Sequence, residues 1–167
     1  MNMLNVAGGN ALEITNCHSY FSICSNGDIG EGGLQSTESV VFDPDRITEL
    51  LCIEPFEKWN KGDRRKQVKD EKHPSAKYGF SCWSACYQTE PAIDAEEQCL
   101  NIVRALREKI PLLQVIKNEY DVGFSISVVP HIYNEETPVL VFNKEIIEFC
   151  YLTDTEIGID LYVYDKE

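Results

Sequence analysis

Residues 94–129 constrain the fold of this chain most, because a helical period changes there into a strand period. Apolar side chains recur three or four positions apart from Cys99 to Ile110, and Asp94 with Glu97 forms the pair typical of a helix start. From Val122 to Val129, apolar residues alternate with glycine and serine, which predicts a strand with one buried face. We therefore expect a principal helix that packs on a sheet.

The rest of the chain reads as further strands and helices separated by turn-forming residues. Pro111 interrupts the principal helix, and a Gly-rich loop at 26–36 and a polar, basic segment at 56–77 are expected to be connections. We expect further helices at 44–52, at 112–118 and from 144, and further strands at 17–25, 39–42, 78–88, 139–142 and 157–163. This order predicts an α+β fold, with a mainly antiparallel sheet and two to four helices packed on it.

The length and composition suit one folded domain. The chain has 167 residues, of which 43% are hydrophobic and 26% charged. We expect a flexible leader at 1–16 and a single domain at 17–167. The leader lacks the basic and apolar regions of a signal peptide, and no run approaches the roughly 20 apolar residues of a membrane helix. We therefore expect a cytoplasmic protein that does not bind membranes.

The cysteine and histidine patterns favour neither a disulfide framework nor a metal site. There are seven cysteines, an odd number, without a C-x-x-C motif, and they lie mostly in apolar surroundings. The three histidines, His18, His73 and His131, have no metal-type spacing. We expect free thiols that act as small core residues, no disulfide, no metal and no cofactor.

The charge of the chain is strongly negative and unevenly distributed. The formal net charge is −13, yet residues 60–77 hold seven basic against three acidic residues, which leaves −17 on the rest. Such a field repels nucleic acid and anionic membranes and favours a basic partner. Solubility alone is the alternative explanation of the acidity.

Several short motifs resemble a bacterial family known as domain of unknown function 4279 (DUF4279). The matching segments run through most of the chain and are Asp43-Pro44-Asp45-Arg46-Ile47-Thr48-Glu49-Leu50-Leu51, Ile53-Glu54-Pro55, Trp59-Asn60-Lys61-Gly62-Asp63, Trp83-Ser84, the helix from Asp94, and Ile159-Asp160-Leu161-Tyr162. The resemblance implies an α+β fold and a bacterial cytoplasmic origin, and it supplies no reaction. Small acidic families of this kind include immunity proteins, which neutralise a toxin made by the same cell.

No motif in the sequence specifies a reaction. Ser84 lacks the G-x-S-x-G context of a hydrolase, and the Gly-rich loop matches no phosphate-binding pattern. A nucleophilic pair of Cys86 with His131 stays open, because such partners meet in space and not in sequence. Two core thiols on a buried strand are the alternative, and we expect the protein not to be an enzyme.

The candidate partner-binding residues are acidic or aromatic. On the last strand they occupy the alternation opposite Ile159, Leu161 and Val163, where we expect an open row beside Ser125 and Ser127. Half-exposed sheet tyrosines without a partner are the alternative, and the tryptophan also suits an anchor that packs the basic loop onto the domain. The candidates are Asp160, Tyr162, Tyr164, Glu135, Glu136, Trp59 and Asp63.

These patterns together favour a protein that works by binding another protein. We expect an immunity protein that blocks a basic toxin, such as a nuclease, at its active or substrate-binding site, and that does not bind nucleic acid. The alternative is an enzyme or small-molecule-binding domain with a cleft near the basic loop 59–77.

Overall fold

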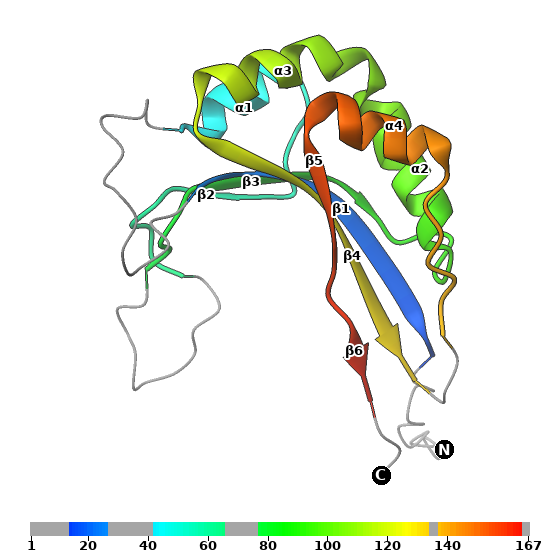
Figure 1. Ribbon diagram of the computed structural model, residues 1–167. Helices are drawn as coiled ribbons and strands as arrows, with labels where there is room; N and C mark the ends of the chain where they lie inside the picture. The colour runs from blue at the N-terminus through cyan, green and yellow to red at the C-terminus, as the bar shows by residue number, and fades with distance from the viewer. Residues whose placement is uncertain (1–13, 27–41, 66–76, 134–136, 165–167) are drawn as a thin grey trace, which may run out of the picture.

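The computed structural model describes residues 14–26, 42–65, 77–133 and 137–164 of the chain. None of the described helices is long and apolar enough to cross a bilayer. In chain order, the elements are β1 (Asn16–Ser25), α1 (Pro44–Leu51), β2 (Glu57–Trp59), β3 (Cys82–Gln88), α2 (Ala95–Leu106), the 3₁₀ turn η1 (Arg107–Lys109), α3 (Ile110–Glu119), β4 (Val122–Ile132), α4 (Lys144–Thr153), β5 (Thr155–Ile159) and β6 (Tyr162–Val163) (Figure 1).

The strands form one mixed sheet in the order β2-β3-β1-β4-β5, with β6 also on β4. β1 pairs antiparallel with β3 on one side and with β4 on the other, and β2 pairs antiparallel with β3. β5 and β6 each run parallel to β4. A parallel pair needs a long crossover, and α4 lies in the segment that joins β4 to β5. The α+β fold with a mainly antiparallel sheet is confirmed, and β5 and β6 are its parallel members.

The described α-helices all lie on one side of the sheet, where they cover the hydrophobic core (Figure 1). Because successive strand residues point to opposite faces, alternate side chains of each long strand enter this core. They include Phe21 on β1, Trp83 on β3 and Phe124 on β4, all of them buried. Leu106 of α2 is fully buried among them, as the helical period predicts.

The helices begin where the sequence places their caps. The side chain of Asp43 accepts from the Asp45 N–H at 2.9 Å, and that of Asp94 accepts from the Glu97 N–H at 3.0 Å. Asn143 caps α4 in the same way. These side chains satisfy N–H groups that lack a partner within the helix. The principal helix ends at Leu106, earlier than its period predicts, because η1 intervenes before α3.

Three predicted elements differ in the structure. The segment 56–77 is not wholly irregular, since it contains β2. Residues 139–142 form no strand: Val139 makes a single bridge to Asp94, and its side chain is exposed. The last strand is divided into β5 and β6. Most of the loop 26–36 and of the strand 39–42 lies outside the described residues.

The folded domain begins before residue 17. Residues 1–13 of the expected leader lie outside the described residues, but Thr15 is buried and Asn16 opens β1. The Thr15 hydroxyl donates to the carbonyl of Tyr133 at 2.7 Å and accepts from its N–H at 2.8 Å. These bonds fix the start of β1 beside the end of β4.

Candidate functional site

The side of the sheet that carries none of the described helices is its open face, and a row of paired residues crosses five strands through its middle. On β1, Phe21 and Ile23 enter the core, so Tyr20, Ser22 and Cys24 point to the open face. Strand pairing then places five residues side by side in the order Glu57, Ser84, Ser22, Ser125 and Glu156. We call the three central residues the serine row, and a carboxylate stands at each of its ends.

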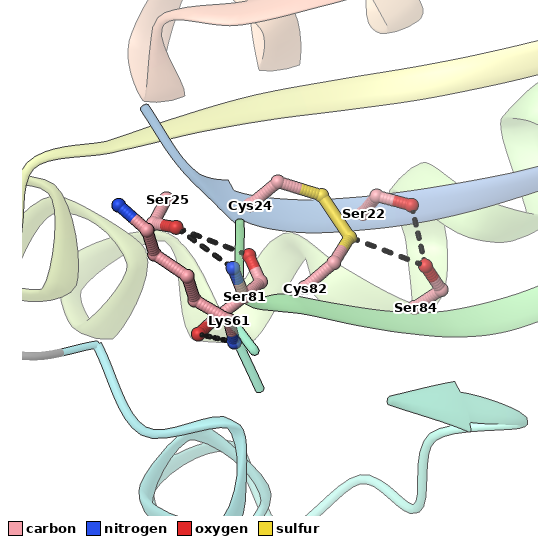
Figure 2. Close-up of a disulfide and its surroundings, with 7 residues drawn as sticks. All are labelled: Ser22, Cys24, Ser25, Lys61, Ser81, Cys82 and Ser84. Carbon is pink, nitrogen blue, oxygen red and sulfur yellow. Dashed lines mark hydrogen bonds between the residues drawn. A yellow bond between two sulfur atoms is a disulfide. The ribbon is translucent and has the colours of Figure 1, made fainter. Parts of the chain in front are cut away.

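Because the side chains of the serine row are small, the centre of the open face is a depression between larger residues. Ser22 and Ser84 are buried, and their hydroxyls share a hydrogen bond of 2.7 Å (Figure 2). The two carboxylates belong to strands at opposite sides of the sheet. At roughly 4.8 Å per strand spacing, their backbones lie about 19 Å apart. That is too far for the paired acid and base of a glycosidase, whose carboxyl groups lie about 5–9.5 Å apart.

Eight rings form a continuous cluster along one side of the serine row. His18 links its two halves, because its ring centroid lies 5.4 Å from that of Tyr87 and 5.4 Å from that of His131. At the far end, Tyr133 and Tyr164 stack at 4.4 Å. We call the set the aromatic cluster, and its members are Phe56, Tyr87, Tyr20, His18, His131, Tyr162, Tyr164 and Tyr133.

A β-bulge in β3 brings Tyr87 into the aromatic cluster. By simple alternation, Tyr87 would share the core face with Trp83 and Ala85. The register between β1 and β3 shifts at this point, and Cys86 has a left-handed φ of 57°. A bulge re-aims the following side chain, so Cys86 packs against the core and Tyr87 reaches the open face. Burial raises the pKa of the Cys86 thiol to about 11.

One hollow lies on the open face, and a second lies beside it, where β1, β4 and β5 meet α3 and the end of α4. The first, which we call the aromatic hollow, has a volume of about 410 Å³ and lies between Tyr20, Phe56, Trp59 and Tyr87. The second, of about 480 Å³, is lined by Lys117, Asp154 and Glu156 among others. Cys24, Phe80 and Ser125 line both hollows, so the hollows are adjacent, and we call the two together the groove.

A disulfide joins Cys24 and Cys82 (Figure 2), and Cys24 belongs to the lining of both hollows. The expectation of free thiols throughout is wrong for this pair. The two residues are 58 positions apart in sequence, but β1 and β3 place them directly opposite each other with a Cα–Cα distance of 4.1 Å. Spacing along the chain carries no information about such a partner. The remaining cysteines, Cys17, Cys52, Cys86, Cys99 and Cys150, are free.

Burial and hydrogen bonding perturb several groups of the open face. Burial, and secondarily the nearby His131, lowers the pKa of His18, so this imidazole is neutral near neutral pH. A hydrogen bond of 2.9 Å from the Tyr162 hydroxyl to Asp160 raises the pKa of that phenol. The second hollow contains a cation, Lys117, whose Nζ lies 3.0 Å from Asp154 and 5.1 Å from the centroid of the Phe124 ring.

The structure brings four of the predicted partner-binding residues to the open face. Asp160, Tyr162 and Tyr164 lie together, but beside His131 and Tyr133 rather than beside Ser125 and Ser127, since Tyr162 pairs with His131. Trp59 forms part of the aromatic hollow and stacks on Tyr78 at 4.4 Å, which fits the anchoring role.

The other predicted partner-binding residues are not placed there. Asp63 is exposed and accepts from the Asn60 N–H at 2.8 Å, so its side chain closes a local turn. Glu135 and Glu136 lie outside the described residues. Among the residues that the structure describes, no group of three or more His, Cys, Asp or Glu side chains is placed to hold a metal. Cys86 lies against the core while His131 belongs to the aromatic cluster, so the nucleophilic pair is not assembled.

Sequence reasoning missed most of this surface. His18 and Tyr20 fall on the exposed alternation of the first strand, which was the one available signal for them. Phe56 lies in a segment that was expected to be irregular, and Tyr87 depends on the bulge. The serine row depends on the register of three strands, and its flanking carboxylates on that of two more, which no local pattern reveals.

The fold and the open face define an α+β domain with a helix-covered side and a groove lined by rings on the other. A family model described as "Domain of unknown function (DUF4279)" matches residues 15–164, so the chain belongs to that family. No curated protein matches the chain, and no solved structure matches it.

Proposed function

We propose that this protein is an immunity protein, which binds a basic toxin through the open face and covers the toxin's active or substrate-binding site. The observation that carries the proposal is the aromatic cluster, which extends from Phe56 beside β2 to Tyr133 at the end of β4 and has no described helix above it. Rings of this kind dominate the energetics of protein interfaces, because they bury a large area and lose little side-chain entropy.

Exposure of the cluster supports a surface that is completed by another molecule. Phe56 is 48% exposed, Tyr87 46% and Tyr162 44%, although each contacts neighbouring rings. Contiguous apolar area on a soluble protein marks an interaction site more often than scattered single residues do. The groove beside the cluster would accept side chains that protrude from the partner.

The charge of the chain supports a basic partner. With a net charge of −13, the protein attracts a cationic surface from a distance, and Glu57, Glu156 and Asp160 place carboxylates at the borders of the open face. Opposite fields accelerate encounter, while buried rings slow dissociation. A nuclease has a basic substrate-binding site, and an acidic surface with a central groove complements it.

Co-expression with the product of the neighbouring upstream gene tests the proposal. We expect that product to arrest growth alone, and this protein to restore growth and to co-purify with it. Tyr162→Ala should weaken protection. Tyr151→Ala is the matched control, because Tyr151 is 85% exposed on α4, on the helix-covered side. A neighbour that is harmless, or that stays toxic and unbound, would contradict the immunity role.

The aromatic hollow favours a second candidate, a small-molecule-binding or catalytic domain. Its volume of about 410 Å³ falls in the range of roughly 300–1,000 Å³ that ligand pockets occupy, and it lies next to the start of the basic loop. Native mass spectrometry of the purified protein distinguishes this candidate. A stoichiometric small molecule that is lost in the Tyr20→Ala variant would support it over the immunity role.

A further inference from the structure

We propose that the aromatic hollow receives an arginine side chain of the protein partner, with Glu57 as its counter-ion. This inference rests on the proposed function, which supplies a basic protein partner, and it names the chemical group that enters the groove. Three features of the hollow carry it: planar rings on its walls, one carboxylate at its border, and hydroxyl oxygens on its floor.

The walls of the hollow suit the flat faces of a guanidinium group. The Phe56 ring lies 5.0 Å from Tyr87 and 5.4 Å from Tyr20, measured between centroids, so three rings converge on one side. Trp59 stands nearby on β2 and is held by stacking on Tyr78 at 4.4 Å. Arginine stacks on aromatic faces and is the cation most often found over them.

The charge of the hollow selects a cation. Among the described residues that line it, Glu57 is the one carboxylate, and none is a lysine or an arginine. Burial lowers the pKa of His18, the remaining basic side chain of the lining. Glu57 forms no ion pair with another described residue, whereas its neighbour Lys58 is bound to Asp45 on the helix-covered side. An anion would be repelled here, and a neutral group would cover the carboxylate without compensating its charge.

The floor supplies acceptors for the remaining N–H groups. Glu57 pairs directly with Ser84, and the Ser84 hydroxyl is bonded to that of Ser22. Ser125 and Ser127 continue the floor on β4 and are only partly buried. A guanidinium presents five N–H donors in a planar fork, so it bonds a carboxylate and adjacent hydroxyl oxygens at the same time. A lysine ammonium lacks this planar fork.

The two tryptophans of the chain allow a direct test by NMR. We would titrate ¹⁵N-labelled protein with N-acetyl-arginine methylamide and follow the indole N–H signals. Trp59 borders the hollow, while Trp83 is fully buried and donates to the Thr48 hydroxyl at 3.0 Å, so its signal is an internal control. We expect a saturable shift of the Trp59 signal alone, and none with the uncharged citrulline analogue.

A matched pair of variants assigns the counter-ion. Glu57→Gln should weaken binding of the arginine probe about tenfold, as expected for the loss of a charge-assisted hydrogen bond. Glu156→Gln removes the same charge at the other end of the serine row, outside the aromatic hollow, and should leave binding unchanged. An equal loss in both variants, a silent Trp59 signal, or an equal response to the lysine analogue would overturn the assignment.

The same variants separate this inference from the proposed function. If the toxin binds and Tyr162→Ala weakens it, but Glu57→Gln binds the toxin like the unsubstituted protein, the arginine assignment is wrong and the immunity role stands. If the arginine probe binds at Trp59 while the neighbouring gene product is harmless, the guanidinium site stands and the immunity role falls.

Discussion

The hydroxyl of Ser22 on β1 lies 2.7 Å from that of Ser84 on β3, in the middle of the open face. Both residues are buried although no described helix covers them, because the rings of the aromatic cluster rise on one side of the row. One hydroxyl donates this bond and the other accepts it, so the two oxygens keep lone pairs for a further donor. This pair keeps the floor low and polar at the same time.

Removing one hydroxyl of this pair should lower the free energy of unfolding by more than the contribution of the hydrogen bond itself. We expect Ser22→Ala and Ser84→Ala each to lower the free energy of unfolding by about 1 kcal/mol, since each leaves a buried hydroxyl unsatisfied. The double variant should lose less than the sum of the two, by about 0.5–1.5 kcal/mol. Urea unfolding of the four proteins measures this coupling, and strict additivity would show that the bond contributes nothing.

Leu106 tests the packing of α2 on the sheet. Its side chain is fully buried, so Leu106→Ala should lower the free energy of unfolding by about 2–5 kcal/mol through the lost contacts and the remaining cavity. Leu152→Ala is the control, because Leu152 is an exposed leucine on α4, and its replacement should change stability by no more than about 0.5 kcal/mol. Similar losses at both positions in denaturant unfolding would contradict the placement of the core.

The disulfide predicts a dependence of stability on the redox state. It closes a loop with a sequence separation of 58, so its removal should lower the free energy of unfolding by about 2–4 kcal/mol. The measurement compares a Cys24→Ser/Cys82→Ser variant with the oxidised protein. Cys52→Ser, at an exposed free cysteine, is the control and should have little effect. Peptide mapping under non-reducing conditions must find the Cys24–Cys82 link, or the pairing is wrong.

His18 predicts a loss of stability in mild acid. Burial and His131 lower its pKa in the folded state below the usual 6.5, so the unfolded chain binds the proton first as the pH falls. Above about pH 6.5, His18 is neutral in both the folded and the unfolded state and does not change the free energy of unfolding. Below this pH, the free energy of unfolding should decrease until the pH reaches the pKa of His18 in the folded state. His18→Gln should flatten this decline in pH-dependent unfolding, and His131→Gln should reduce it. If the free energy of unfolding depends on pH in the same way in His18→Gln, another group causes the decline.

Kinetics of the toxin complex should separate anchoring from steering. Tyr162→Ala removes an exposed ring of the cluster and should raise the dissociation rate constant about 10- to 100-fold. Glu156→Gln should mainly slow association, and this effect should disappear as salt shortens the Debye length below about 10 Å. Surface plasmon resonance at several salt concentrations measures both. A salt-independent association rate would contradict steering.

Local patterns predicted the parts of the fold that depend on neighbours in sequence. Asp43, Asp94 and Asn143 cap their helices by bonding N–H groups two or three residues on, so the sequence alone identifies them. Apolar residues alternate with small ones from Val122, which marks one buried face of β4, so this strand was also predictable from the sequence. Residues 139–142 have strand-forming side chains as well, but there the chain makes a single bridge, because strand propensity does not supply a pairing partner.

The candidate site depended on strand pairing, which local patterns do not contain. Tyr162 and Tyr164 were found by alternation within one segment, yet their neighbours were misassigned because the register of β6 against β4 was unknown. The Cys24–Cys82 disulfide was missed for the same reason, because the register of β3 against β1 was unknown. A one-residue change of register would move every side chain to the other face, so these relationships follow from the assembled sheet alone.

The bulge at Cys86 also determines how sequences of this family should be aligned. Cys86 is the additional residue of β3: Ser84 and Tyr87 face the groove, and Ala85 faces the core, as they would in a strand without it. An alignment gap at position 86 would therefore leave both faces of the strand unchanged. A gap at Ser84 would instead align a groove-facing residue of the shorter relative with Ala85, which faces the core, so a difference in chain length here has to be assigned to position 86 before the two faces of β3 are compared between relatives.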